Sequence, residues 1–462
     1  MNKLLPCNQS PSLFLGEPVM KNIVIQNRII RFVEVLICAL IMHIELQSQS
    51  FNPALASRLQ KTIDSILIAK DIKGISAGVY IPNMGTWQGV SGISHPGAPI
   101  TSDMEFAIAS NTKLFTAVLL LKLAEHNKLR LSDSLHAFLP SFKNIDSNIT
   151  IRQLLNNTTG LDDVTSVPGY PDSILSNPRR VYTASELLTW AGPPAFAPGK
   201  GWEYCNTNYL LAGLIAEKVT GQSYGKLLRD SILTPLNLDS TFLDVHDSVL
   251  YTIAHPWQAG RDNSATPRIS LNSAAGAAGG MYSTSNEMLQ WYDALMNGKV
   301  INAQSLKEMT TFVEKERYGM GIAEYIVSGK PVWTHGGQIW GGYNSSMMYD
   351  PSTGIIVCIL TNQLPAQAFQ ISAQILTTVW NSTVGIAESE DTESMLYPNP
   401  TNDMVTISSD LTIQSIKIYD IHGKLLMEST ESTFSIAQLP CGTYQVRAYT
   451  VEEVRNYSLI KH

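Results

Sequence analysis

A serine and a lysine three residues apart give the chain a possible nucleophile and base. Ser110 and Lys113 stand in the segment Phe106 to Lys122, and residues three apart share one face of a helix. A serine hydroxyl at a helix start becomes a nucleophile when a neighbouring base takes its proton. The alternative is that Ser110 only caps the helix and Lys113 extends to water.

The helix that must position this pair is predicted to be buried. From Leu114 to Leu121 the sequence is apolar on nearly every face, and only Thr116 interrupts it. A helix that is apolar all round belongs inside a domain. Burial makes an ammonium costly, which lowers the pKa of Lys113 toward that of a useful base.

Length and composition restrict the class of protein. The 462 residues allow two or three domains, and the net charge of -7, without basic runs, argues against a nucleic-acid partner. The five cysteines are scattered, and His and Cys are never at metal-ligand spacing, so neither a disulfide framework nor a metal or other cofactor is expected.

Periodicity predicts an α/β (α+β) main domain over residues 51–380. A helix over Pro53–Ala69 and a hairpin through Ile75–Ile81 and Trp87–Val90 open it. Helices and loops follow to about residue 310, with a small-residue turn at Ala274–Ser283. Strands then return at Val332–Gly337, Tyr343–Tyr349 and Ile355–Leu360, before a helix over Gln367–Trp380. This order predicts one antiparallel sheet built from both ends of the domain, flanked by helices and carrying an inserted helical lobe.

Two further motifs follow Ser110-x-x-Lys113 in the order of a known family. They are Tyr204-x-Asn206 and His335-Gly-Gly337, supported by Leu154–Leu161 and Gly279–Thr284. Over about residues 52–380 the chain resembles the penicillin-recognising serine hydrolases, the branch with class C β-lactamases, D-Ala-D-Ala carboxypeptidases, D-aminopeptidases and related esterases. The resemblance implies the β-lactamase/DD-peptidase fold and hydrolysis of an amide or ester through an acyl-enzyme.

The resemblance also implies a role for each motif residue. Ser110 would attack the carbonyl, and Lys113 and Tyr204 would take its proton and protonate the leaving group, with the choice of base left open. Asn206 would bind substrate or hold Lys113. The backbone N–H groups of Ser110 and Gln338 would form the oxyanion hole. Gly336 and Gly337 would let substrate approach the strand edge.

The third motif departs from the β-lactamase pattern. β-Lactamases usually have Lys-Thr-Gly where this chain has His335-Gly336-Gly337. Peptidase and esterase members do have His there. The departure favours a D-Ala-D-Ala carboxypeptidase-like or D-amino-acid peptidase activity, with an esterase or weak β-lactamase as the alternative. His335 has a second interpretation as a core histidine that donates to a carbonyl, and a non-catalytic peptidoglycan-binding protein is the rival from another class.

Both ends of the chain predict export. Lys21 to Arg31, an apolar run over Phe32–Ile44 and small polar residues to Ser50 are typical of a signal peptide within residues 1–50, with Met20 as the possible start. The run is too short for a stable membrane span. After a linker at 381–394, residues 395–462 predict a small all-β sandwich. Its Tyr397–Pro400, Leu439–Tyr444 and Leu459–Lys461 resemble the type IX secretion sorting domain. We therefore expect a secreted or surface protein whose tail engages the secretion machinery.

Overall fold

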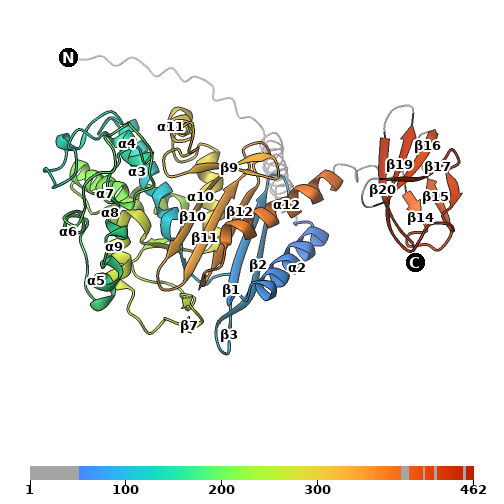
Figure 1. Ribbon diagram of the computed structural model, residues 1–462, viewed down its shortest axis with the longest axis horizontal. Coiled ribbons are helices and arrows are strands. Elements are labelled where there is room, and N and C mark those ends of the chain that lie inside the picture. Colours follow the sequence, from blue (N-terminus) through green and yellow to red (C-terminus); the bar gives the residue numbers. More distant parts are fainter. Residues whose placement is uncertain (1–50, 387–394, 409–411, 421–423, 451–453, 462) are drawn as a thin grey trace, which may run out of the picture.

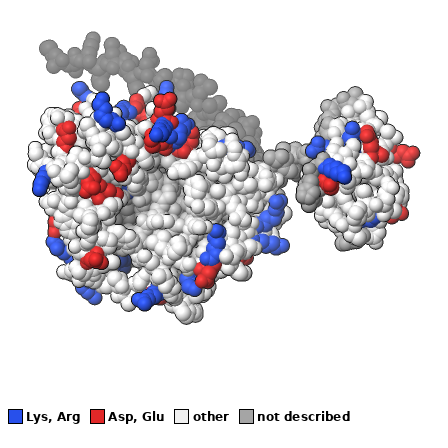
Figure 2. Space-filling view, in the orientation of Figure 1, with Lys and Arg blue, Asp and Glu red and all other residues white. Residues whose placement is uncertain are grey.

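The computed structural model describes residues 51–386, 395–408, 412–420, 424–450 and 454–461. The leader expected over residues 1–50 lies outside these described residues. Within them, no helix combines the length and the apolar character that crossing a membrane requires. Figure 2 shows that positive and negative side chains are mixed over the visible face, with no large area of one sign.

A seven-stranded antiparallel sheet forms the centre of the main domain (Figure 1). Its order is β3-β2-β1-β12-β11-β10-β9. The two ends of the domain meet where β1 pairs with β12, with Ile75 opposite Thr361, as the sequence predicts. The strands are β1 (Gly74–Ile81), β2 (Gly85–His95), β3 (Ala98–Pro99), β9 (Ala323–Val327), β10 (Lys330–Ile339), β11 (Tyr343–Tyr349) and β12 (Ile356–Thr361).

Helices from both ends of the domain cover one face of this sheet. They are α2 (Pro53–Ala69) and α12 (Ala368–Ile386), which lie together beside the sheet in Figure 1. Leu59 and Ile63 of α2 and Ile371 of α12 are fully buried in one apolar cluster with the inward side chains of β1 and β12. Asn52 caps α2 by accepting the Leu55 N–H, and Pro53 begins the helix.

The opposite face packs on α10 (Ser285–Met296) and on the helical lobe around α3 (Thr112–Glu125). Every residue of α3 from Thr112 to Leu121 is buried, which confirms the prediction from its all-round apolar surface. Phe115 of α3 stacks on Trp291 of α10 with ring centroids 4.2 Å apart. The remaining helices are α4 (Ile151–Leu155), α5 (Tyr170–Ser176), α6 (Ala184–Leu188), α7 (Asn206–Thr220), α8 (Tyr224–Leu228), α9 (Ile269–Gly279) and α11 (Ala303–Met309).

The lobe differs from the sequence prediction at Ala274–Ser283. The expected small-residue turn is the second half of α9, which continues to Gly279 despite a non-helical Gly276. The small side chains serve close packing, because a Cβ on Gly213 of α7 would come within 2.7 Å of the Ala277 Cβ. After α9, Met281–Ser283 forms a short strand, β8.

The main domain also has two short sheets that the sequence does not predict. One has the order β4-β8-β5 and the other β13-β6-β7. Their strands are β4 (Phe106–Ala107), β5 (Phe242–Leu243), β6 (Trp257–Gln258), β7 (Arg261–Asp262), β8 (Met281–Ser283) and β13 (Gln363–Leu364). Two-residue strands are too short for the alternation that reveals a strand in sequence.

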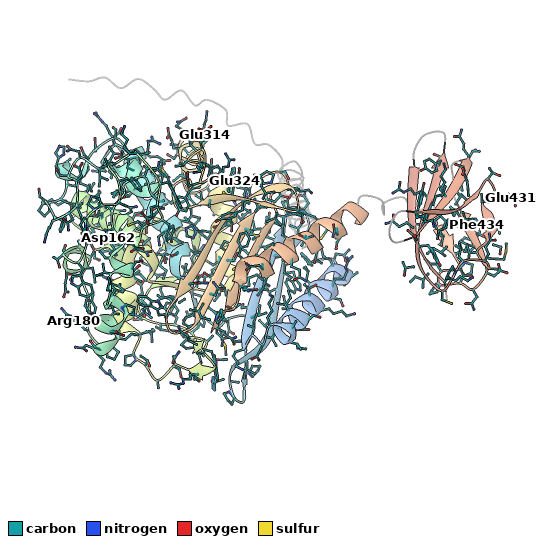
Figure 3. The ribbon with its side chains drawn as sticks, viewed as in Figure 1. Asp162, Arg180, Glu314, Glu324, Glu431 and Phe434 are labelled. Carbon is teal, nitrogen blue, oxygen red and sulfur yellow. The ribbon has the colours of Figure 1, made fainter. Side chains whose placement is uncertain are left out.

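A separate all-β module follows the main domain. The helix α12 runs to Ile386, six residues into the expected linker at 381–394, and residues 387–394 lie outside the described part. The module has its own apolar cluster, which includes Val405, Ile418 and Phe434 (Figure 3). Its sheets have the orders β14-β15-β18 and β17-β16-β19-β20. The strands are β14 (Met395–Tyr397), β15 (Met404–Ser408), β16 (Ile413–Tyr419), β17 (Leu425–Ser429), β18 (Thr433–Ser435), β19 (Gly442–Thr450) and β20 (Val454–Lys461).

Candidate active site

Ser110 lies on a tight turn between a strand and the buried helix. β4 leads into the short helix η1 (Ala109–Asn111), which continues directly into α3. Ala109 has a φ of +47°, a value that residues other than glycine rarely adopt, so the backbone of the turn before Ser110 is strained. The Ser345 hydroxyl donates to the Ile108 carbonyl at 2.7 Å and fixes the turn to the sheet.

Lys113 is completely buried beneath Ser110. Its Nζ lies 3.0 Å from the Ser110 Oγ, 2.6 Å from the Asn206 Oδ1 and 2.8 Å from the Ala278 carbonyl oxygen. Burial lowers the pKa of Lys113 from 10.5 to about 7, against the opposing charge of Asp163, which raises it. A large fraction of Lys113 is therefore a neutral amine at neutral pH.

Asn206 begins α7 and is held in one orientation. Its Nδ2 donates to the Asp163 carboxylate and to the Thr165 Oγ1, each at 2.9 Å. With the amide nitrogen facing these two acceptors, the Oδ1 faces Lys113. Asp163 and Thr165 are functional neighbours that the sequence interpretation missed. The only signal was their place just after the Leu154–Leu161 motif, and no spacing rule links that place to residue 206.

Tyr204 lies over the lysine amine. Its ring centroid is 4.9 Å from the Lys113 Nζ. Burial and the neighbouring Tyr318 raise the pKa of Tyr204 well above 10, although the nearby Ser110 side chain opposes this. The hydroxyl therefore keeps its proton at neutral pH.

His335 is buried beside Tyr204, with ring centroids 6.2 Å apart. Its Nδ1 lies 2.7 Å from the Gly336 carbonyl oxygen, which can only accept, so Nδ1 holds the ring proton. Its Nε2 then accepts from the Tyr318 hydroxyl at 3.0 Å. Burial, with the charge of Lys113, lowers the pKa of His335 to about 3.

Both ring nitrogens of His335 thus have partners inside the protein. A substrate could bind to the ring only by replacing one of these partners. The bond to the Gly336 carbonyl is the contact expected for a core histidine. His335 is therefore a neutral imidazole beside Tyr204.

The strand β10 forms one wall of a pocket at Ser110. β9 pairs with β10 only as far as the Thr334–Ala323 pair, and the following edge of β10 contributes Gln338 to the pocket. The pocket has a volume of about 240 Å³ and includes Ser110, Asn206 and Trp340. A strand edge next to a nucleophile can bind a substrate backbone.

The two glycines of β10 differ in their surroundings. A Cβ on Gly337 would lie 2.3 Å from the Ile108 carbonyl oxygen and 3.0 Å from the Ala109 Cβ. Gly337 therefore lets β10 contact the turn that presents Ser110. A Cβ on Gly336 would meet nothing closer than the Ser345 carbonyl oxygen at 3.6 Å.

The structure thus brings together Ser110, Lys113, Tyr204 and Asn206, with His335 behind Tyr204 and Gln338 at the pocket edge. No group of three or more His, Cys, Asp or Glu side chains in the described part of the chain is arranged to hold a metal ion. The buried amine beside a serine hydroxyl has the arrangement needed for nucleophilic catalysis.

Comparisons with known proteins agree with this geometry. A family model described as Beta-lactamase matches residues 59–377. The chain belongs to the beta-lactamase family. This family contains serine hydrolases that act through an acyl-enzyme, and the fold predicted from the sequence is confirmed. A second model, described as a secretion system C-terminal sorting domain, matches residues 395–461 and indicates export by type IX secretion.

Among solved structures, the chain is similar to a D-stereospecific amidohydrolase from Streptomyces sp. The two are 30% identical, with a TM-score of 0.59 over 66% of this chain and 94% of the other. A D-amino acid amidase from Ochrobactrum anthropi SV3 is 26% identical, with a TM-score of 0.64 over 71% and 99% of the two chains.

Two curated relatives extend the comparison. Penicillin-binding protein 4 of Amycolatopsis lactamdurans is 26% identical over 67% of this chain and 86% of its own length. Protein flp of Staphylococcus aureus is 36% identical over 160 residues. Those residues are 32% of this chain and 31% of the relative, so the chain spans about a third of that protein.

Proposed function

We propose that this member of the family is an exported serine hydrolase that cleaves amide bonds at D-amino acid residues, with Ser110 as nucleophile. The observation that carries the proposal is the Lys113 amine, fully buried and 3.0 Å from the Ser110 hydroxyl. The amidase and amidohydrolase relatives support the D-configured substrate. The leader and the sorting domain support delivery to the cell surface or beyond.

The hydrogen bonds around Lys113 favour it as the base. The Asn206 Oδ1 and the Ala278 carbonyl oxygen can only accept, so a neutral Lys113 donates its two hydrogens to them. Its lone pair then points at the Ser110 hydroxyl and can take that proton. The Ser110 oxygen attacks the substrate carbonyl, and the resulting oxyanion would bind the N–H groups of Ser110 and Gln338.

Tyr204 is the better donor to the leaving group. Its raised pKa keeps the hydroxyl protonated, and its place beside Lys113 and Ser110 puts it near the reacting atoms. The tetrahedral intermediate breaks its C–N bond as the amine takes the Tyr204 proton, and Lys113 returns a proton to Tyr204. A water molecule then attacks the acyl-enzyme by the reverse proton path and releases the acid and free Ser110.

The neutral His335 favours substrates with an uncharged leaving side. A lysine at this position would offer a positive charge to a free carboxylate, whereas the pKa of His335, about 3, leaves the ring uncharged. Amides, and also esters, have no such carboxylate. A D-Ala-D-Ala carboxypeptidase or β-lactamase activity, which acts on free acids, is expected to be the weaker one.

A covalent label and a substrate panel test the proposal. A fluorophosphonate should add to Ser110 by intact mass and peptide mapping, and Ser110→Ala should lose both the adduct and turnover. The panel should include D-amino acid amides, N-acetylated D-peptide amides, their free acids, short-chain esters and a chromogenic cephalosporin. Labelling that persists in Ser110→Ala would overturn the mechanism. Binding of peptidoglycan fragments without any label or turnover would favour the non-catalytic alternative.

A further inference from the structure

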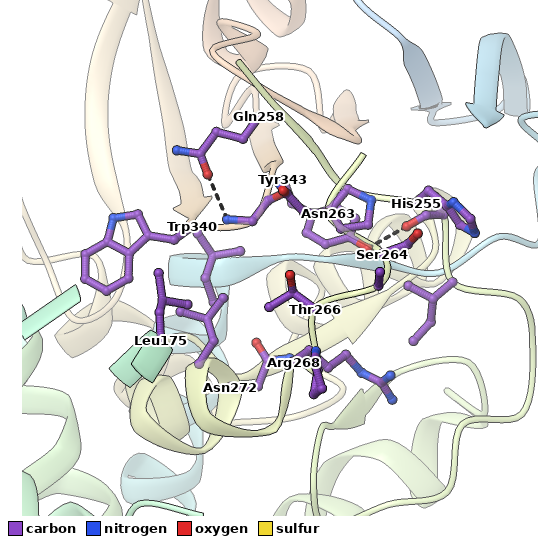
Figure 4. A pocket seen from close by; sticks show the side chains of 18 of the residues that line it. Leu175, His255, Gln258, Asn263, Ser264, Thr266, Arg268, Asn272, Trp340 and Tyr343 are labelled. Atoms are coloured by element: carbon purple, nitrogen blue, oxygen red, sulfur yellow. Dashed lines mark hydrogen bonds between the residues drawn. The ribbon is translucent and has the colours of Figure 1, made fainter. Parts of the chain in front are cut away.

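A second and larger pocket opens beside the one at Ser110 (Figure 4). It has a volume of about 730 Å³. The two pockets share Leu271, Ile339 and Trp340, so they adjoin each other. Figure 4 shows Leu175 and Trp340 on one side, His255 and Asn263 on the other, and Thr266 between them.

The direction of β10 places this pocket on the acyl side of the scissile bond. His335, near the proposed proton donor Tyr204, precedes Gln338 along the strand. Ile339, Trp340 and Gly341 follow and line the large pocket. If the leaving group departs toward Tyr204, the acyl part of a substrate lying along β10 extends the other way, past Trp340.

The ionisable side chains at the large pocket already have partners. Arg268 pairs with the buried Asp244, with 2.8 Å between its Nε and the Oδ2. The His255 Nδ1 lies 2.8 Å from the Asp262 carboxylate. No Asp or Glu side chain lines either pocket within the described ranges. The Asp163 carboxylate, behind Asn206, accepts from Asn206 and Thr165.

The lack of a lining carboxylate disfavours an acyl donor with a free α-amino group. The ammonium of an unmodified amino acid amide would enter the pockets without a carboxylate partner, and burying an unpaired charge is unfavourable. In contrast, the large pocket is lined by the neutral amides of Gln258, Asn263 and Asn272, whose Oε1, Nδ2 and Nδ2 atoms respectively bond within the protein. Its apolar surface comes from Trp340, Leu271 and Leu175. Such a mixture suits an uncharged peptide segment.

We propose that the large pocket binds an uncharged, N-acylated peptide segment on the acyl side of the cleaved bond. The enzyme therefore acts on peptides with at least one residue before the D-residue, in preference to single D-amino acid amides with free amines. This inference rests on the proposed function and names its substrate class.

Three amides that differ only on the acyl side test it. They are D-phenylalanine amide, N-acetyl-D-phenylalanine amide and N-acetyl-glycyl-D-phenylalanine amide, compared by kcat/KM at pH 7. Acetylation should raise kcat/KM at least tenfold, and the added glycine should raise it further. Equal values for the free and acetylated amides, with Ser110-dependent turnover, would overturn this inference and leave the proposed function in place. Absence of turnover and of Ser110 labelling would overturn the proposed function itself.

Substitutions that fill the large pocket test whether it causes the preference for longer acyl groups. Thr266→Trp places an indole on the exposed loop that lines the pocket, and it should lower the ratio of kcat/KM between the longest and the shortest acetylated amide at least tenfold. Ala265→Trp, on the same loop, repeats the test if Thr266→Trp folds poorly. Ser65→Trp, on the exposed surface of α2, is the control and should leave the ratio unchanged. An unchanged ratio in both loop variants would overturn the assignment of the pocket.

Discussion

Asp163→Asn should change the pH dependence of hydrolysis, although Asp163 does not contact Ser110 in any described bond. Its carboxylate accepts from Asn206, which accepts from Lys113 in turn. Removing a negative charge near an ammonium destabilises the charged form, so the pKa of Lys113, about 7, should fall. The acidic limb of the kcat/KM profile should therefore move to lower pH, by about one unit, which corresponds to about 1.4 kcal/mol.

The same substitution should also lower the maximum of the profile. The bond from Asn206 to the carboxylate is assisted by charge, and its loss costs about 1.5–3 kcal/mol. If the whole cost fell on the transition state, kcat/KM would drop by roughly 10–150-fold. Asp163→Asn should thus be slower at its optimum but keep a larger share of that optimum at pH 5.5.

Asp162→Asn is the matched control. Asp162 is the next residue and lies in the helical lobe (Figure 3), and its carboxylate accepts from the Gly192 N–H at 2.8 Å instead of from Asn206. The profile of Asp162→Asn should overlay the wild type. The assay is kcat/KM on one N-acetylated amide from pH 5 to 9, with the Tm of each variant measured alongside. A uniform loss in Asp163→Asn with no shift of the acidic limb would refute this account of Lys113.

Three other perturbations have defined outcomes. Deleting residues 395–462 should leave hydrolysis by the purified main domain unchanged and abolish surface delivery in cells, and normal delivery would contradict the role of the tail. Tyr318→Phe leaves the buried Nε2 of His335 without a donor, so it should cost about 1–3 kcal/mol in urea unfolding without moving the limb near pH 7. Burial, with Glu287 nearby, raises the pKa of Glu105 to about 7, so the folded state holds a proton that the unfolded state releases above about pH 4.5. Stability should fall as the pH rises through this window, and Glu105→Gln should gain about 2–3 kcal/mol at pH 8 but little at pH 4, unlike a mutation that only disturbs packing.

The parts of the fold that the sequence predicts are those with a strong period. The apolar stripe of α2 must face the core, and the all-round apolar surface of α3 must be buried. The sequence therefore predicts both helices. The two-residue strands β4 and β5 are too short for any period. The helical second half of α9 depends on its contact with Gly213 of α7, which no local pattern reports.

The sequence predicts the residues of the candidate site that belong to short motifs. It does not predict those that approach the site only through tertiary contacts. Ser110 and Lys113 are neighbours on one helix, so their spacing alone predicts contact. Asp163 reaches Asn206 only because the loop after α4 folds against the start of α7. The hydrogen bond to the His335 Nε2 likewise depends on Tyr318, which lies seventeen residues earlier and is bridged to Ala323 of β9.

The order of the sheet has a consequence for when the enzyme becomes active. β1 lies between β2 and β12, so the sheet remains incomplete until the chain reaches Thr361. Gln338, the expected second oxyanion donor, belongs to this late part, whereas Ser110 and Lys113 emerge much earlier. A chain that is still being synthesised therefore contains Ser110, the proposed nucleophile, before it contains Gln338. Under the proposed mechanism, the complete site therefore forms only after the last strands of the sheet have docked beside β1.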